Sequence, residues 1–444
     1  MLKHKVALGS GFFAIFFVGH GIGALAIPYY QMTLGVDPFL LGLVLTIPVF
    51  FSALISPWAA TVIDAFSHVR NSHRVILIAS GWFCALSFAA MWRVPTHWSD
   101  TLSILYLFGC SLIFFFFATF MTVVVRCLAV ESTPESRELT AVMGFTTIFE
   151  KLGSIIYFWL FPLAQSKLFF SLTVGMKTIG LWVSVLLIGI LSSVSGLLCR
   201  SRDKRAIALV NSQASTPFSP PLYTQVKWLF AVTVIQFGLI GVCINLDFYV
   251  LVYFINAGDI AQGAIWKGYL STGYALFGLL AIPVIVKAGN RFGKKRTLQF
   301  IYAINCINAL SKWFIYQPGM EHWLIIDSLL GTWVWTAHTT LIPAILADIC
   351  YENQRITGSL SDSYVVARHN RVSNLALVIS FVGSGLLLNL IGFNADTTTA
   401  QSDSVLFTMR LVLVAGSLMF SGLALFVLSK FTFHRTVASH QPRP

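Results

Sequence analysis

The sequence has little charge, and most of its charge is of one sign. Only 10% of its 444 residues are charged, and 17 acidic side chains stand against 29 basic ones. Soluble domains carry about 25% charged residues, and 57% hydrophobic residues are too many to hide in the cores of a chain of this length. The composition excludes an ordinary soluble protein and, with a mean hydropathy of +0.79, indicates that lipid is the solvent.

Cysteine is scarce too, and the motifs of enzyme chemistry are missing. The seven cysteines show no metal-ligand spacing and are expected to act as small apolar fillers. We find no nucleophile with a matching base and no phosphate-binding loop. We therefore expect a protein that is not an enzyme and that has no cofactor, no metal and no nucleic acid partner.

What the sequence does have is a series of long hydrophobic runs, each long enough to span a bilayer, for which about 20 residues suffice. Of the 29 Lys and Arg residues, 21 lie in stretches on one side of the predicted spans. The positive-inside rule then places both termini in the cytoplasm of a multi-pass protein, which we expect in a bacterial inner membrane. The twelve runs cover 6–30, 39–63, 75–92, 102–125, 141–164, 178–199, 228–254, 264–286, 297–317, 322–346, 372–393 and 405–429.

A basic and polar interruption at 200–227 divides the chain after six runs. It separates an N-terminal half, 1–199, from a C-terminal half, 228–432, and a cytoplasmic tail follows at 433–444. Basic loops occur in every multi-pass protein, but this linker position favours two six-helix repeats. Such repeats predict an all-α membrane protein of the major facilitator architecture, with its substrate site between the halves. We expect a monomer.

Four stretches then carry a family resemblance. They are Pro28–Val36 with the following helix, Glu135–Ser154, Arg291–Thr297, and Ala347–Phe393 followed by Met409–Leu411. In this order the chain resembles the glycoside-pentoside-hexuronide:cation symporters, the melibiose-permease-like branch of the major facilitator superfamily. The resemblance implies cation-coupled sugar uptake, with carboxylates on the second and fourth helices holding the cation.

The chain departs from this family at the cation site. Ser52 and Ser56 stand where the second helix of the family has carboxylates, and Thr122 stands at the acid of the fourth helix. Without a carboxylate, nothing balances the charge of a dehydrated cation. We therefore expect coupling to protons, or no coupling, rather than to sodium. The candidate coupling residues are Glu150, Ser52, Ser56, Thr122 and Arg126.

The sugar-binding positions depart as well, since Phe16, Gly144 and Asn374 replace charged residues of the family. His20 lies one turn after Phe16 on the same helix face, and ionisable groups inside spans are functional candidates by default. The predicted substrate-binding residues are His20, Tyr30, Gly144, Thr147, Lys151, Asp247, Trp335, His338 and Asn374.

Each of these candidates also has a structural interpretation. Lys151 could donate to a substrate while its neighbour Glu150 titrates, or the two could be a structural pair. His20 and His338 could be neutral packing residues, and single aromatic residues often anchor helices at the interface. The close glycines Gly383 and Gly385 predict tight helix packing.

The loops suggest a gate. Opposite charges could form an ion pair that breaks between inward-open and outward-open states, although topology alone accounts for the basic residues. The candidate gating residues are Asp64, Arg70, Arg74, Arg291 and Asp348.

Together these features predict a secondary transporter that works by alternating access. The intramembrane cations favour a sugar, glycoside or sugar acid, and the expected partners are this solute, protons and membrane lipids. Two alternatives stay open, an amphiphile or lysolipid transporter on the same scaffold and a transport-inactive membrane sensor.

Overall fold

The computed structural model describes residues 2–66, 71–95, 98–131, 149, 152–198, 220–357, 362–394 and 401–432. All regular structure in these ranges is helical. Ten helices are long and apolar enough to cross a membrane, and Leu152–Ala164 is a shorter apolar helix. With α13 (Lys294–Ile315), which carries several polar side chains, these helices match the twelve hydrophobic runs. The predicted all-α membrane fold is confirmed.

The N-terminal half contains the helices that follow the first six runs. One π-helical segment (Ile27–Gln31) extends the first span. A second one (Val183–Ile190) joins the two α-helices of the sixth span. The elements are α1 (Leu2–Ala26), η1 (Ile27–Gln31), α2 (Pro38–Ala65), α3 (Ser72–Met91), α4 (Asp100–Glu131), η2 (Tyr157–Trp159), α6 (Leu160–Ala164), α7 (Leu172–Trp182), η3 (Val183–Ile190) and α8 (Leu191–Leu198).

The C-terminal half begins with α9 at Pro220, inside the predicted 200–227 linker. Gly293, at φ +90°, lets the chain turn directly from α12 into α13. The elements are α9 (Pro220–Thr233), η5 (Val234–Leu239), α10 (Ile240–Ile244), α11 (Leu246–Tyr249), η6 (Val250–Ile255), α12 (Ile260–Phe292), α13, η7 (Glu321–Trp323), α14 (Leu324–Thr357), α15 (Asp362–Leu390), α16 (Asp403–Leu411), η8 (Val412–Gly416) and α17 (Ser417–Lys430).

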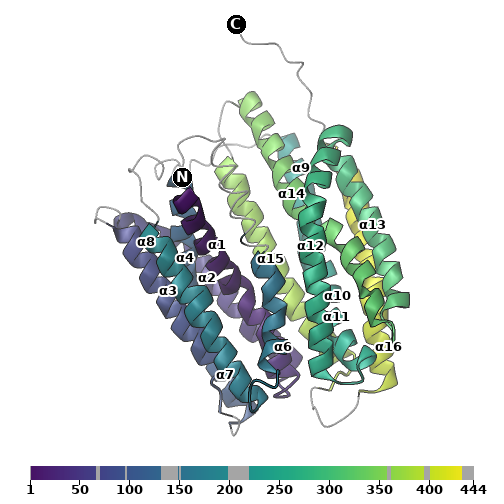
Figure 1. The fold of residues 1–444 in the computed structure, drawn as a ribbon. Helices are drawn as coiled ribbons and strands as arrows, with labels where there is room; N and C mark the ends of the chain where they lie inside the picture. Colours follow the sequence, from purple (N-terminus) through teal and green to yellow (C-terminus); the bar gives the residue numbers. More distant parts are fainter. Residues whose placement is uncertain are drawn as a thin grey trace.

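The two groups of helices stand side by side (Figure 1). We call the end where α1 begins the proximal end, at the top of the view, and the opposite end the distal end. Helix α15 lies at the border and packs on α2, where Gly42 approaches the backbone of Phe381 and Val382. The division of the chain into two halves at the 200–227 linker remains a prediction.

Buried apolar side chains form two clusters. One joins most of the N-terminal half to parts of the C-terminal half near the distal end, such as Leu246–Val252. The other belongs to the C-terminal half alone and includes Leu229 and Ile342. Near the distal end, a single cluster of buried apolar side chains therefore includes residues of both halves.

The outer surface is apolar. Leu54, Leu86, Leu280 and Leu390 are each more than 60% exposed. Apolar surface on this scale is rare in soluble monomers, whereas lipid tails cover it at no cost. The surface fits a chain that spans a bilayer.

Candidate functional site

An aromatic and histidine group lies on α1 at the boundary between the halves. The rings of Phe16 and His20 stack at 4.6 Å, and the ring of Tyr157 from η2 meets His20 edge-on at 6.3 Å. Phe16 fills the space beside Gly153, whereas Gly23, on the same face of α1, approaches Phe381 of α15. His20 lies between these contacts and is exposed, and its Nδ1 donates to the Phe16 carbonyl one turn earlier at 3.1 Å.

A buried ion pair adjoins this group. The Lys267 ammonium of α12 donates to both carboxylate oxygens of Asp247 of α11, at 2.6 and 2.7 Å. The two side chains are only 13% and 4% exposed. The ammonium also lies 5.0 Å from the ring centre of Phe158, which belongs to the N-terminal half. Because a buried charge needs a partner, the pair is neutral as a unit.

Tyr157 connects the histidine to the ion pair. Its hydroxyl lies near Ser271, one turn after Lys267 on α12, and near Asp247. We name the five residues His20, Tyr157, Asp247, Lys267 and Ser271 the interface site. It offers a carboxylate, an ammonium, an imidazole, two hydroxyls and stacked rings, drawn from four helical segments of both halves.

Hydrogen bonds between the halves close the distal side of this site. The Tyr249 hydroxyl donates to Gln31, and the Asn389 amide donates to Asp37 at 2.7 Å. We call these two hydrogen bonds the distal seal. A third, from the Trp159 indole to Thr272 at 2.8 Å, lies on the proximal side of Lys267 along α12. They hold together parts of the chain that are far apart in sequence.

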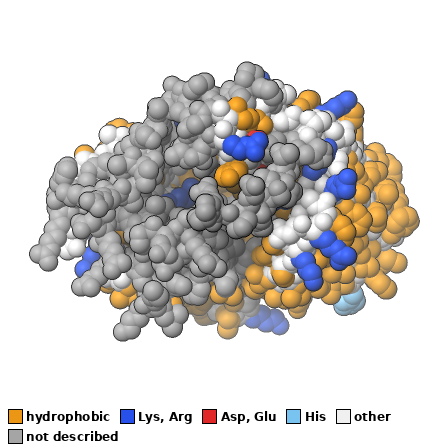
Figure 2. Space-filling model, turned by 90° about the horizontal axis from the view of Figure 1, so that it is seen from above, with side chains coloured by type: hydrophobic (Ala, Val, Ile, Leu, Met, Phe, Trp, Pro, Cys, Tyr) orange, Lys and Arg blue, Asp and Glu red, His pale blue; other side chains and the backbone are white. Residues whose placement is uncertain are grey.

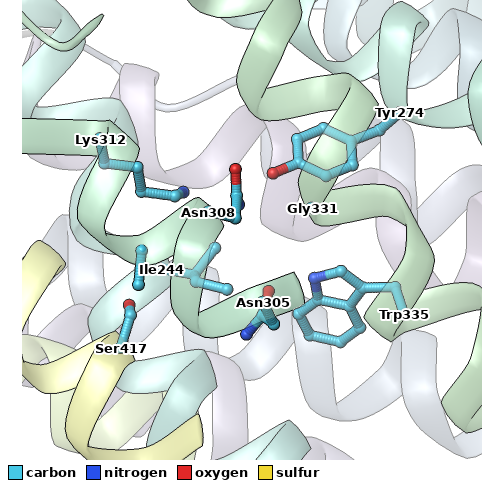
Figure 3. A pocket seen from close by; sticks show the side chains of 9 residues that line it. Ile244, Tyr274, Asn305, Asn308, Lys312, Gly331, Trp335 and Ser417 are labelled. Atoms are coloured by element: carbon cyan, nitrogen blue, oxygen red, sulfur yellow. The ribbon is translucent and has the colours of Figure 1, made fainter. Parts of the chain in front are cut away.

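A second charged cluster lies inside the C-terminal half (Figure 3). Asp327 accepts hydrogen bonds from Asn308 at 2.8 Å, Lys312 at 3.1 Å and Tyr316 at 2.7 Å. The cluster ties α13 to α14, which is a structural role.

A small pocket borders this cluster. It is lined by Ile244, Tyr274, Asn305, Asn308, Lys312, Trp335 and Ser417, with room for about one water molecule. In Figure 3 the side chains of Tyr274, Lys312 and Asn308 point toward one another. The predicted binding residue Trp335 therefore faces the interior of the C-terminal half.

Where the resemblance places the family's cation site, this chain has hydroxyl side chains, and one of them bonds to a neighbouring hydroxyl. Ser52 of α2 and Thr119 of α4 hydrogen bond at 2.7 Å, and Thr119 also donates to the Phe115 carbonyl. Ser56 and Thr122 are half-buried on the same two helices. Within the described ranges, no group of three His, Cys, Asp or Glu side chains could hold a metal ion. The hydroxyls thus bond to each other without a balancing charge.

Several other predicted residues lie away from the interface site. Tyr30 is fully buried and its hydroxyl donates to the Met91 carbonyl. His338 is buried, and its ring packs edge-on against Phe237 at 4.7 Å, which favours the packing interpretation. Asn374 is exposed on α15. The candidates Gly144, Thr147, Glu150 and Lys151 lie outside the described residues.

The gating candidates are only partly described. Asp348 pairs with Lys294 at 2.6 Å, and the same ammonium donates to the Ala344 carbonyl. Lys294 was not among the predicted gating residues. The side chains of Arg74, Arg126 and Arg291 are exposed. The Asp64 side chain and Arg70 lie outside the described part of the chain.

Sequence reasoning missed Tyr157, Lys267 and Ser271. The signal for Lys267 was present, because it is an ionisable side chain inside a predicted span and therefore a functional candidate by default. Tyr157 and Ser271 carry no such signal. Hydroxyl and aromatic side chains are common in this chain, and only the fold brings these two together.

A bundle of membrane-spanning helices in two groups, with a buried ion pair beside the place where they meet, is the geometry of a membrane transporter. Comparison with known proteins gives the family, since residues 7–435 match the model of a family described as MFS/sugar transport protein. The chain belongs to this family of the major facilitator superfamily. The predictions of a secondary transporter, of a symporter-family scaffold and of a protein that is not an enzyme are thereby confirmed.

Individual proteins are also similar to this chain in sequence or in fold. The chain is 21% identical over 423 residues to the uncharacterized symporter YnaJ of Bacillus subtilis (strain 168), covering 93% of this chain and 88% of that protein. The nucleoside transporter NupG has a similar fold, with a TM-score of 0.66, 13% identity and coverage of 97% and 100% of the two chains. A bacterial homologue of the iron transporter ferroportin in an inward-facing state gives a TM-score of 0.63, 14% identity and coverage of 97% and 99%.

Proposed function

We propose that this secondary transporter moves a neutral, hydroxyl-rich solute, a sugar or a glycoside, through the interface site by alternating access. The observation that carries the proposal is that Lys267, paired with Asp247, lies against the ring of Phe158, whose neighbour Tyr157 contacts the ring of His20. A solute bound there touches both halves, so its binding is sensitive to their relative position.

The chemistry of the site supports this solute class. A carboxylate accepts from sugar hydroxyls and an ammonium donates to them. His20 Nδ1 donates to the Phe16 carbonyl, so its Nε2 accepts from a hydroxyl, and the Phe16–His20 stack offers an apolar face to a ring. Because Lys267 already neutralises Asp247, the described part of the site has no spare positive charge for an anion. A neutral glycoside therefore fits better than a sugar acid.

The same observations support transport without sodium. Ser52 stands at the cation site that the family resemblance implies, and it bonds to Thr119 of α4. Hydroxyls alone are poor ligands for a dehydrated cation because they do not compensate its charge. We propose coupling to protons or transport down the solute gradient.

A nucleoside is the second candidate. It is itself a glycoside, and its base would stack on the aromatic group of Phe16, His20 and Tyr157. The NupG structure, whose fold this chain shares, belongs to a nucleoside transporter.

A ligand panel tests the proposal. Purified protein in detergent is heated with neutral sugars, glycosides, sugar acids, nucleosides and lysolipids, with and without sodium. We expect a neutral glycoside or a nucleoside to raise the melting temperature, since a ligand at 100 times its dissociation constant stabilises the fold by about 2.7 kcal/mol. Stabilisation by lysolipids alone would support the amphiphile alternative and contradict the proposal.

Two variants make the test specific. His20→Ala removes an exposed side chain, so it should abolish the ligand-induced shift and leave the ligand-free melting temperature nearly unchanged. Ser52→Ala, in the vacated cation site, is the matched control and should respond to ligand like the unaltered protein. If His20→Ala and Ser52→Ala lost the ligand-induced rise in melting temperature equally, or if that rise required sodium, the assignment of the interface site would be refuted.

A further inference from the structure

A hollow on the proximal part of α12 has an apolar wall and a basic end. It is lined by Ile282, Pro283, Val286, Lys287, Asn290 and Arg291, all from one face of the helix. Lys287, Asn290 and Arg291 are exposed. Viewed from the proximal end, basic side chains gather beside hydrophobic ones over the C-terminal half (Figure 2).

The length of α12 places this hollow at the level of lipid headgroups. The helix has 33 residues, about 50 Å at 1.5 Å per residue. Residues 268–286 contain no Lys, Arg, His, Asp or Glu, and Lys287 is the first ionisable side chain after this run and is exposed; about 20 apolar residues span the hydrocarbon core. Lys287 therefore marks the proximal boundary of that core, with Arg291 one turn beyond it.

The two cations of the hollow lack acidic partners. Nearby Lys294 is neutralised by Asp348, and Arg355 of α14 pairs with Glu352. Neither Lys287 nor Arg291 forms an ion pair within the described part of the chain. Two like charges one turn apart on one helix face repel each other, and a shared anion removes that repulsion.

The apolar wall decides what kind of anion fits. Ile282, Pro283 and Val286 line the side toward the membrane core, and Val284 and Leu280 beside them are more than half exposed. A free phosphate gains nothing from this wall, whereas an acyl chain buries it. Asn290, between the two cations, adds an amide donor for a phosphate oxygen.

We propose that this hollow binds an anionic phospholipid, with the phosphate between Lys287 and Arg291 and an acyl chain along Ile282, Pro283 and Val286. The site is separate from the transported solute and does not depend on its identity. Each basic residue near an anionic membrane surface strengthens binding about five-fold. Together the two side chains should favour an anionic over a zwitterionic lipid by roughly twenty-fold.

Native mass spectrometry of the full-length protein tests this. The delipidated protein is titrated with phosphatidylglycerol, phosphatidylcholine or inorganic phosphate, and bound molecules are counted. We expect one tight phosphatidylglycerol, weaker phosphatidylcholine and no retained phosphate. The double variant Lys287→Gln/Arg291→Gln should lose the preference for phosphatidylglycerol, about ten-fold or more in affinity.

The control is Lys295→Gln/Arg296→Gln, which removes the same charge from residues that do not line the hollow. It should keep the tight lipid. An equal loss in the control would show general surface attraction, and phosphate bound as tightly as lipid would show a phosphate site. Either result overturns the proposal. Loss of the lipid in Val286→Ser would support the acyl contact.

Discussion

At the scale of single residues, two buried acids in the described spans each bond to a lysine. Asp247 bonds to Lys267, and Asp327 bonds to Lys312. The rule that ionisable residues inside spans are functional candidates identified Asp247 from the sequence. The same rule applies to Lys267, which was not among the predicted residues. Which acid meets which base could not be predicted, because the partners lie on different helices.

The Asp247–Lys267 pair gives a prediction about stability. Asp247→Asn leaves the Lys267 ammonium buried without its counter-charge, and such losses cost about 3–5 kcal/mol. We expect a clearly lowered thermal unfolding midpoint in detergent. Asp247→Asn/Lys267→Met, which removes both charges, should lose less than the sum of the single variants.

The half-exposed pair of Glu352 and Arg355 is the matched control, with side chains 18% and 55% exposed. Glu352→Gln should change stability by less than about 1 kcal/mol. Additive losses at Asp247 and Lys267, or an equal effect of Glu352→Gln, would show that the buried pair is not coupled.

At the scale of helices, the sequence predicted the elements well and their contacts poorly. Hydrophobic runs of about 20 residues identify spans because lipid requires them, and the twelve runs match the helices. The glycines of α15 were correctly predicted to pack tightly, since a Cβ on Gly385 would lie 2.5 Å from the Pro38 carbonyl oxygen. The helix that packs against these glycines could not be predicted, because a small residue does not indicate which neighbour approaches it.

Gly385 gives a prediction about conformation. Gly385→Ala inserts a methyl group against the backbone of the other half, next to the distal seal, and such overpacking costs about 1–3 kcal/mol. The cost falls only on the distally closed state, so its population should fall about five-fold or more. Crosslinking of Asp37→Cys with Asn389→Cys, which replaces a hydrogen-bonded pair across the seal, should drop accordingly.

Gly422→Ala is the control, because a Cβ at Gly422 of α17 meets no atom within 4 Å. It should leave the crosslinking yield unchanged. Unchanged yield in Gly385→Ala as well would mean that the close approach at Pro38 does not limit closure.

At the scale of the whole molecule, two groups of helices meet at the distal end around one polar site. The family resemblance predicted this scaffold, and the family match confirms it. The site itself was only partly predictable, since His20 and Asp247 were named whereas Tyr157 and Ser271 became visible only in the fold. The family's own cation residues are replaced, so its coupling could not be transferred.

The central claim is that a neutral, hydroxyl-rich solute crosses through the interface site without sodium. Counterflow of the glycoside or nucleoside found in the ligand panel, measured in proteoliposomes with and without sodium, tests it most directly. We predict equal flux in both conditions and a loss of at least ten-fold in Lys267→Gln. Flux that requires sodium, or that survives intact in Lys267→Gln, would contradict the account.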